Sequence, residues 1–227
     1  MGGQACILYG AAEFSRDTDL AVAAEGDNLD RLRSALAELQ AQRLAVPPFE
    51  QKYLEMGLAV HFRCFHPEAE KMRIDVLSKM RGLDPFHALW DRRTTLEIGP
   101  QKVHALSLPD LVLSKKTQRD KDWPMLARLV EASYFTTRDS PTPEQVEFWL
   151  RELRTPSLLI EAAARFPREA ERLSRARALL GAARSGDLEG VRSALMEEEK
   201  REREADRHYW APLRQELERL RHTRSNP

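Results

Sequence analysis

The stretch FSRDTDLAV, residues 14–22, places two carboxylates at the beginning of an apolar run. Asp17 and Asp19 stand two positions apart, and on a β-strand residues i and i+2 point to the same face of the sheet. Two like charges held that close repel each other, so they need either a shared proton or a bound hard cation such as Mg²⁺. The stretch therefore predicts a strand over residues 18–23 that begins beside a cation site.

A glycine pair, Gly2-Gly3, precedes Asp17 with thirteen residues between. We expect a short helix over residues 4–12 to open directly after the pair. Backbone N–H groups at such a turn, together with the helix N-terminus, can hold a phosphate. A phosphate cradle and a metal pair are the two components that phosphoryl or nucleotidyl transfer requires.

The glycine pair, the spacer and the triplet Asp17-Thr18-Asp19 together resemble the signature of the DNA polymerase β-type nucleotidyltransferase superfamily. The flanking residues Phe14-Ser15-Arg16 make the chain most similar to the AbiEii-like and minimal nucleotidyltransferases, several of which are toxin or antitoxin components. The resemblance covers residues 1–135. It implies an α+β fold with a small mixed β-sheet core. It also implies Mg²⁺-dependent transfer, with up to two ions, of a nucleoside monophosphate from ATP or another NTP.

In that superfamily a third carboxylate from a later strand completes the metal site. The segment MRIDVL, residues 72–77, alternates apolar and charged residues as a strand does, so Asp75 is the third ligand by resemblance. The alternative is that Asp75 is a surface carboxylate on an edge strand, paired with Arg73 or Lys79. By the same resemblance Asp17 and Asp19 hold the metal ions.

The resemblance also assigns phosphate contacts. Gly2, Gly3 and Ser15 would seat the phosphates, although Ser15 could instead cap the turn before the strand. Related toxin-like members carry a Leu-x-Asp-Leu motif, a lysine about five residues after its Asp, and a closing Lys-Asp or Arg-Asp. The segments LPDLVLSKK (108–116) and RDKD (119–122) are similar.

Lys115 and Lys116 are consecutive on a helix expected over residues 108–117, so their side chains diverge by about 100°. Lys115 shares a helix face with Leu111, which favours the side packed against the core, whereas Lys116 should look outward. We therefore expect Lys115 to contact phosphate, with Arg119 as a second contact. The alternative is a solvated helix face.

One departure from the family concerns the strand that precedes its glycine pair, because here Met1 is the residue before Gly2. The sequence leaves open whether another element fills that place. A second hypothesis is accordingly a catalytically degenerate binding or regulatory module that keeps the fold. The complete set of three carboxylates favours the enzyme.

Composition narrows the class of protein. The 36 Lys and Arg residues equal the 36 Asp and Glu residues, so no global positive field attracts nucleic acid. No apolar run approaches the roughly 20 residues of a membrane span, and we expect a cytoplasmic protein that does not enter a membrane. Cys6 and Cys64 are flanked by apolar residues and are expected to be buried free thiols. The six histidines are scattered, so we expect no zinc site.

The chain is expected to divide into a nucleotidyltransferase-like domain, residues 1–139, and a helical C-terminal extension, residues 140–227, at the segment SPTP (140–143). Within the first part the hydrophobic pattern predicts a helix over residues 28–40. It also predicts an antiparallel strand pair, 58–65 with 72–78, and a hairpin, 94–98 with 102–105. Helices follow from residue 108, over 108–117, 121–134, 143–153, 157–183 and 187–222, with a break near Ser185-Gly186.

The charge run at residues 197–207 lies in the last of these helices. It is either a solvated helix face or a surface that binds a protein partner. The acceptor of the transfer, whether RNA, a protein or a small molecule, is left open by the sequence.

Overall fold

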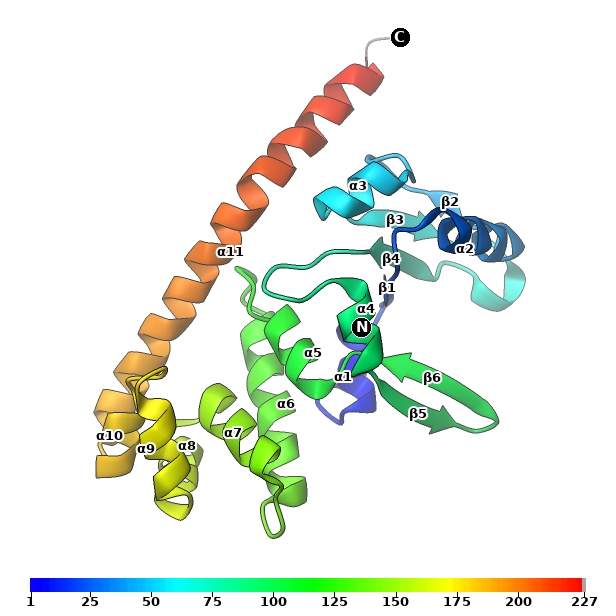
Figure 1. The fold of residues 1–227 in the computed structure, drawn as a ribbon. Helices are drawn as coiled ribbons and strands as arrows, with labels where there is room; N and C mark the ends of the chain where they lie inside the picture. The colour runs from blue at the N-terminus through cyan, green and yellow to red at the C-terminus, as the bar shows by residue number, and fades with distance from the viewer. Residues whose placement is uncertain (226–227) are drawn as a thin grey trace. The chain divides into compact units, whose positions relative to one another are not determined.

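The structure is a computed structural model that describes residues 1–225, and the chain forms two compact units (Figure 1). The first unit comprises Met1–Ser114 and the chain from Arg207 onward, and the second comprises Lys115–Asp206. Helices take 57% of the residues and strands 12%, which confirms the predicted α+β class with a small mixed sheet and a helical C-terminal region. The boundary expected at residue 140 lies in the loop before a helix of the second unit and stays a prediction.

Four strands form a mixed sheet in the first unit, in the order β1-β4-β3-β2. Their bounds are Asp17–Ala21 for β1, Gln42–Arg43 for β2, Val60–Arg63 for β3 and Arg73–Leu77 for β4. Strand β1 runs parallel to β4, whereas β3 runs antiparallel to β4 and to β2. The predicted antiparallel pair is therefore confirmed, and β4 lies inside the sheet between β1 and β3.

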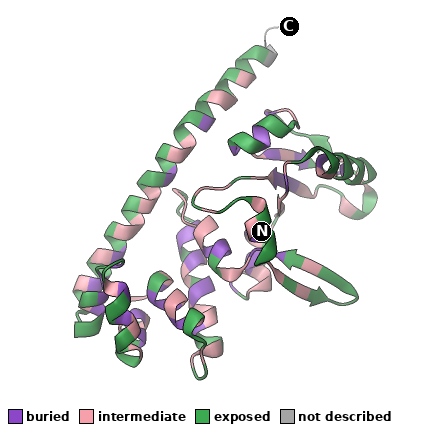
Figure 2. Cartoon of the chain, viewed as in Figure 1, coloured by how far each residue is buried: buried purple, intermediate pink, exposed green. Residues whose placement is uncertain are grey.

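One face of this sheet is apolar and is covered by α2 (Gly26–Glu38) and α3 (Gln51–Met56). Side chains alternate along a strand, so alternate residues of β3 and β4 share this face. The buried residues of the cluster are Leu29, Leu36, Leu54, Val60, Phe62, Cys64, Ile74 and Val76. Figure 2 shows buried residues along these strands and exposed residues on the outer side of α2. Cys64 and Cys6 are buried free thiols, as expected.

The first unit is completed by short helices and a hairpin. Their bounds are Gly2–Leu8 for α1, Pro67–Ala69 for the 3₁₀ turn η1, Phe86–Asp91 for α4, Thr94–Ile98 for β5, Gln101–Ala105 for β6 and Leu108–Ser114 for α5. The predicted hairpin is confirmed as β5-β6. The helix expected over residues 4–12 begins earlier, at Gly2. Helices α3 and α4 and strand β2 were not predicted. The last part of α11 (Leu188–Ser225) packs Leu213 against Tyr53 and Leu58 of this unit.

The second unit consists of helices. Their bounds are Asp122–Thr137 for α6, Pro143–Glu152 for α7, Pro156–Arg165 for α8, Pro167–Ser174 for α9 and Leu180–Ser185 for α10, followed by the first part of α11. Proline stands in the first turn of α7, α8 and α9, where its missing N–H is not needed. The predicted break is confirmed at Gly186, whose φ of 75° ends α10. Residues 157–183, which were expected to form one or two helices, lie in three helices, α8, α9 and α10.

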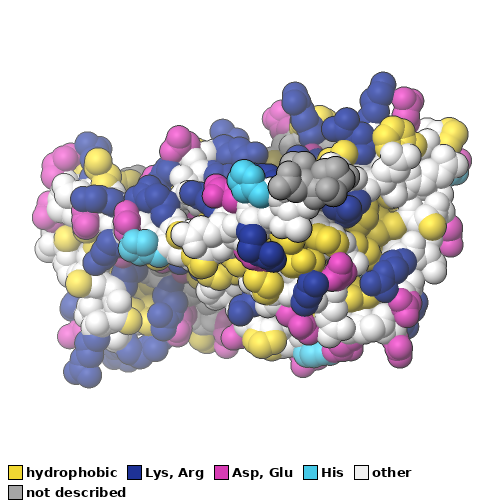
Figure 3. All heavy atoms as spheres, turned by 90° about the horizontal axis from the view of Figure 1, so that it is seen from above, with side chains coloured by type: hydrophobic (Ala, Val, Ile, Leu, Met, Phe, Trp, Pro, Cys, Tyr) yellow, Lys and Arg dark blue, Asp and Glu magenta, His cyan; other side chains and the backbone are white. Residues whose placement is uncertain are grey.

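None of the helices in residues 1–225 is long and apolar enough to cross a membrane. Basic and acidic side chains are interspersed over the face drawn in Figure 3, in keeping with the balanced composition.

Leu54→Ala removes from the apolar cluster a side chain that has no exposed surface. Because the surrounding core closes only part of the resulting cavity, we expect the free energy of unfolding to fall by about 2–5 kcal/mol. Leu44→Ala, at a leucine that is 42% exposed, should cost less than about 0.5 kcal/mol. Urea unfolding followed by circular dichroism compares the two, and equal losses would show that this cluster is not the core.

Candidate functional site

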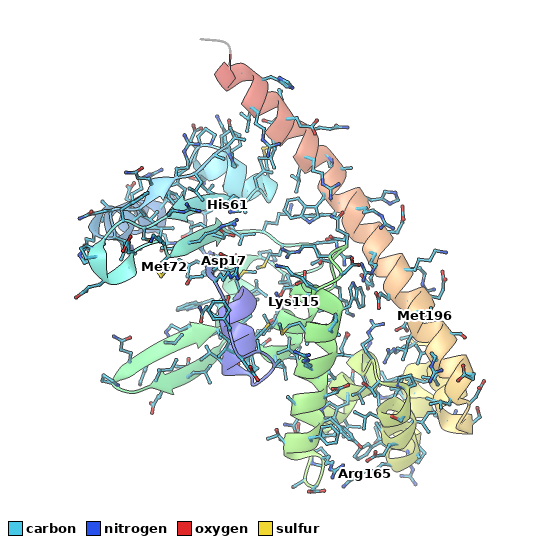
Figure 4. The ribbon with its side chains drawn as sticks, turned by 180° about the vertical axis from the view of Figure 1, so that it is seen from behind. Asp17, His61, Met72, Lys115, Arg165 and Met196 are labelled. Carbon is cyan, nitrogen blue, oxygen red and sulfur yellow. The ribbon has the colours of Figure 1, made fainter. Side chains whose placement is uncertain are left out.

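The face of the sheet opposite the apolar cluster carries charged residues. In the parallel pair of β1 and β4, Asp17 lies opposite Arg73 and Asp19 lies opposite Asp75. In the antiparallel pair of β3 and β4, His61 lies opposite Asp75. Residues directly opposite each other project to the same face. The register therefore brings all three predicted carboxylates to one face, together with His61 and Arg73 (Figure 4, where Asp17 and His61 are labelled).

Asp75 is the most enclosed of these residues, at 8% exposed. Arg73 donates to both of its carboxylate oxygens, from Nε to Oδ1 at 2.8 Å and from a terminal nitrogen to Oδ2 at 3.1 Å. Nδ1 of His61 lies 2.8 Å from Oδ1. Burial alone would raise the pKa of Asp75, but the hydrogen bonds with His61 and Arg73 outweigh burial and hold it below the usual 3.8. The ion pair with Arg73 that the sequence left as an alternative is present, but β4 is an interior strand and not an edge strand.

Arg73 is the cation that the three carboxylates share. Its pKa is raised chiefly by the hydrogen bond to Asp75, with burial acting in the opposite direction and the charges of Asp75, Asp17 and Asp19 adding to the rise. A planar guanidinium with several donors suits this position, because it can bond one carboxylate in a fork and still attract two others. The polar face therefore already contains positive charge beside its three carboxylates, from Arg73 and from the terminal ammonium of Met1, which donates to the carbonyl oxygen of Asp19 at 2.9 Å.

The glycine pair packs directly against this face. Gly2 has a φ of 65°, and a Cβ placed on it would overlap the Oδ2 atom of Asp19. A Cβ placed on Gly3 would overlap the Oγ atom of Ser15, which itself donates to the carbonyl oxygen of Asp17 at 3.0 Å. Only glycine lets the backbone come this close. Gly2, Gly3 and Ser15 are thus brought together with Asp17 and Asp19, and their role as a phosphate cradle stays a prediction.

The fit of a magnesium ion to these residues is partial. Carboxylate oxygens are the ligands that Mg²⁺ prefers, and Asp17 and Asp19 offer them on one face. Both oxygens of Asp75 are engaged by Arg73. Within residues 1–225, no group of three or more His, Cys, Asp or Glu residues is arranged to hold a metal ion. A cation at all three carboxylates would therefore compete with Arg73.

A small cavity of about 90 Å³, which the sequence analysis did not anticipate, adjoins Asp19. Its wall includes Phe86 and Trp90 of α4, whose rings stack with centroids 5.8 Å apart. The guanidinium of Arg93 lies 4.0 Å from the centroid of Trp90, and the ring of His104 meets Trp90 edge-on at 4.9 Å. These side chains pack on the Trp90 ring and form one wall of the cavity. The sequence feature that could have indicated the Phe86–Trp90 contact is the i, i+4 spacing of the two aromatic residues in FHALW, residues 86–90.

Lys115, Lys116 and Arg119 lie in the second unit and form ion pairs there. Lys115 Nζ lies 3.5 Å from Asp122 Oδ1, and Arg119 Nε lies 3.0 Å from Asp122 Oδ2. Lys116 Nζ lies 2.8 Å from a carboxylate oxygen of Glu152, and its side chain is only 11% exposed. The expectation that Lys116 looks outward is therefore wrong. The reason is that α5 ends at Ser114, so both lysines lie beyond the helix on which the face assignment depended.

No protein-family model matches this chain, and a search of curated proteins finds no match. The resemblance to the nucleotidyltransferase superfamily therefore stays a hypothesis.

Gly2→Ala should be far more damaging than Gly10→Ala. Both glycines have a positive φ, 65° and 75°, so both substitutions carry a backbone strain of about 1 kcal/mol or more. Only at Gly2 would the new methyl group overlap Asp19, because a Cβ on Gly10 would meet no atom within 4 Å. Melting temperatures of the two variants test this, and equal shifts would show that the close approach of Gly2 to Asp19 is not needed.

Proposed function

We propose that this chain is a Mg²⁺-dependent nucleotidyltransferase. It would move a nucleoside monophosphate from an NTP onto a hydroxyl or phosphate of an acceptor and release pyrophosphate. The observation that carries the proposal is the register Asp17–Arg73 and Asp19–Asp75, which gathers three carboxylates on the polar face of the sheet. The glycine pair adds support, because Gly2 and Gly3 pack directly against Asp19 and Ser15, the residues that the resemblance assigns to the same site.

In this proposal Asp17 and Asp19 hold magnesium, which when bound would neutralise charge on the triphosphate. The backbones of Gly2 and Gly3 and the hydroxyl of Ser15 seat the phosphates. Arg73 leaves Asp75 and turns its fork toward phosphate oxygens, for which guanidinium geometry is well suited. Asp75 is then available as the third ligand and as the group that helps to remove the proton of the attacking hydroxyl.

The cavity beside Asp19, at about 90 Å³, is too small to enclose a nucleotide base, so the proposal assigns no residues to the base. Lys115, with Arg119 second, stays our candidate for a further phosphate contact, and each would exchange its bond to Asp122 for one to phosphate. The acceptor is RNA, a protein or a small molecule. A role in a toxin–antitoxin pair, a cytoplasmic location and a protein partner at the C-terminal helices belong to the same proposal.

A catalytically degenerate binding or regulatory module is the second candidate. The observation that favours it is the engagement of both Asp75 oxygens by Arg73, with His61 beside them. If this ion pair is permanent, Asp75 is a structural carboxylate and the polar face holds at most a nucleotide.

Incubation with α-³²P-labelled NTPs, Mg²⁺ and cellular RNA or protein decides between the two. We expect wild-type protein to label an acceptor and Asp19→Asn to lower the rate by about 10²–10³-fold, the scale of losing one electrostatic contact to the transition state. Asp30→Asn, an exposed carboxylate on α2, is the matched control and should keep full activity.

Thermal shifts with Mg²⁺ and NTP separate binding from chemistry, because a ligand of the native state raises the melting temperature by mass action. Asp19→Asn should abolish the magnesium-dependent part of the shift. A shift without any transferred label would support the degenerate module, and no shift at millimolar nucleotide would exclude both candidates.

A further inference from the structure

We propose that the second unit contains a binding site for a small organic monoanion, such as a carboxylate with an apolar or aromatic body, in the cavity beside Arg154. This inference is independent of the proposed nucleotidyl transfer, because every residue that lines the cavity belongs to the second unit.

The cavity has the size and the chemistry of a small-molecule site. Its volume is about 450 Å³, within the range of roughly 300–1,000 Å³ typical of ligand pockets. Its walls are largely apolar, with Trp123 and Ala127 from α6 and Leu195 and Met196 from α11. Met196 is 68% exposed (labelled in Figure 4). An apolar ligand body would cover this side chain, and burial of its apolar surface would stabilise the complex.

Arg154 is the polar group in this wall that has donors to spare. Its side chain is nine-tenths buried, and one of its terminal nitrogens donates to Glu198 Oε2 at 3.0 Å. Its Nε atom is buried and has no hydrogen-bond partner among the described residues. A guanidinium carries five N–H donors, and leaving them unpaired away from water is costly.

Arg154 shares the carboxylate of Glu198 with a second arginine, Arg177. Arg177 reaches the two oxygens of Glu198 at 3.1 and 2.9 Å and donates to the carbonyl oxygens of Leu150 and Leu153. Burial, and then the charge of Arg177, lower the pKa of Arg154, whereas the charges of Glu198, Glu152 and Glu202 act in the opposite direction. None of these carboxylates accepts a hydrogen bond from Nε of Arg154, and an anion in the cavity would supply that acceptor.

The other charged groups of the wall already form ion pairs, within the wall or with a neighbour outside it. Arg203 binds Asp120 at 2.7 Å and Glu199 at 2.7 Å. Arg192 lies 3.0 Å from Glu189 and is more than half exposed. Among these wall residues Arg154 alone has a buried guanidinium nitrogen without a hydrogen-bond partner, which is why the expected ligand carries one negative charge and not the several charges of a triphosphate.

Trp123 holds this arrangement in place. Its indole N–H donates to the carbonyl oxygen of Thr117 at 2.8 Å, which fixes the ring. The guanidiniums of Arg154 and Arg203 lie 5.2 and 5.6 Å from its centroid, within the range of a cation–π interaction. These contacts orient the ring and both guanidiniums in the absence of a ligand, and such preorganisation lowers the entropic cost of binding.

The test uses two probes of nearly the same shape on the full chain. One is 1-anilinonaphthalene-8-sulfonate, an aromatic monoanion, and the other is N-phenyl-1-naphthylamine, which lacks the sulfonate. Fluorescence titration should show one saturable site that binds the anion at least about tenfold more tightly than the neutral amine, the scale of a hydrogen bond to a charged group.

Arg154→Gln should weaken binding of the anion by about tenfold or more and leave binding of the neutral amine unchanged. Arg177 still pairs Glu198 in that variant, so the fold should persist. Arg168→Gln, an exposed arginine of α9 outside the cavity, is the matched control and should bind as wild type does. Ala127→Phe keeps Arg154 but fills the cavity, and it should block both probes.

Equal affinity for the two probes would overturn the proposal. So would the absence of saturable binding, or binding of the anion that neither Arg154→Gln nor Ala127→Phe weakens.

Discussion

The ion pair between Asp75 and Arg73 is the constraint on which the sheet of the first unit depends. A carboxylate on an interior strand, 8% exposed, needs a partner inside the protein, and Arg73 supplies it from the same strand two residues earlier. Because residues i and i+2 share a face, this pair fixes which side of β4 is polar. The alternate β4 residues, Ile74 and Val76, must then face the apolar cluster under α2 and α3. The register with β1 carries Asp17 and Asp19 to the polar side as a consequence.

The same pair gives the two functional hypotheses a common physical basis. Three carboxylates on one face need positive charge, and either an arginine or a metal ion can provide it. In the structure Arg73 provides it. If Mg²⁺ and a triphosphate arrive together, they bring both the cation that the carboxylates need and the anion that Arg73 needs. The exchange would therefore keep the charges paired, and the nucleotidyltransferase proposal rests on that exchange.

Hydrophobic periodicity predicted much of this fold. Alternation at every second residue indicated strands, and spacing of three or four residues indicated helices. The alternation in residues 58–65 and 72–78 identified β3 and β4 and their antiparallel pairing, and Gly186 marked the start of the last helix correctly. Helices α3 and α4 have six residues each, fewer than two helical turns, and β2 has two, so none of them shows a full repeat of its hydrophobic pattern and they were not predicted. The end of α5 at Ser114 could not be read from the sequence either, and the face assignment of Lys115 and Lys116 failed with it.

Sites built by residues distant in sequence were the least predictable. The spacing of Asp17 and Asp19 placed them on one face, but their relation to Asp75 came only from the family resemblance, since strand register is a property of the folded sheet. No sequence pattern indicated that Arg154 binds Glu198, 44 positions away. The ring contact between Trp90 of α4 and His104 of β6 was equally hidden.

The central claim is that Asp17 and Asp19 bind a cation when a nucleotide displaces Arg73 from Asp75. Diffraction from crystals grown with Mn²⁺ and a non-hydrolysable NTP analogue, measured at the manganese absorption edge, tests it directly. The account predicts an anomalous peak at bonding distance from Asp17 and Asp19, with the Arg73 guanidinium on the phosphates. An analogue bound with no manganese at these carboxylates, and Arg73 still on Asp75, would contradict it.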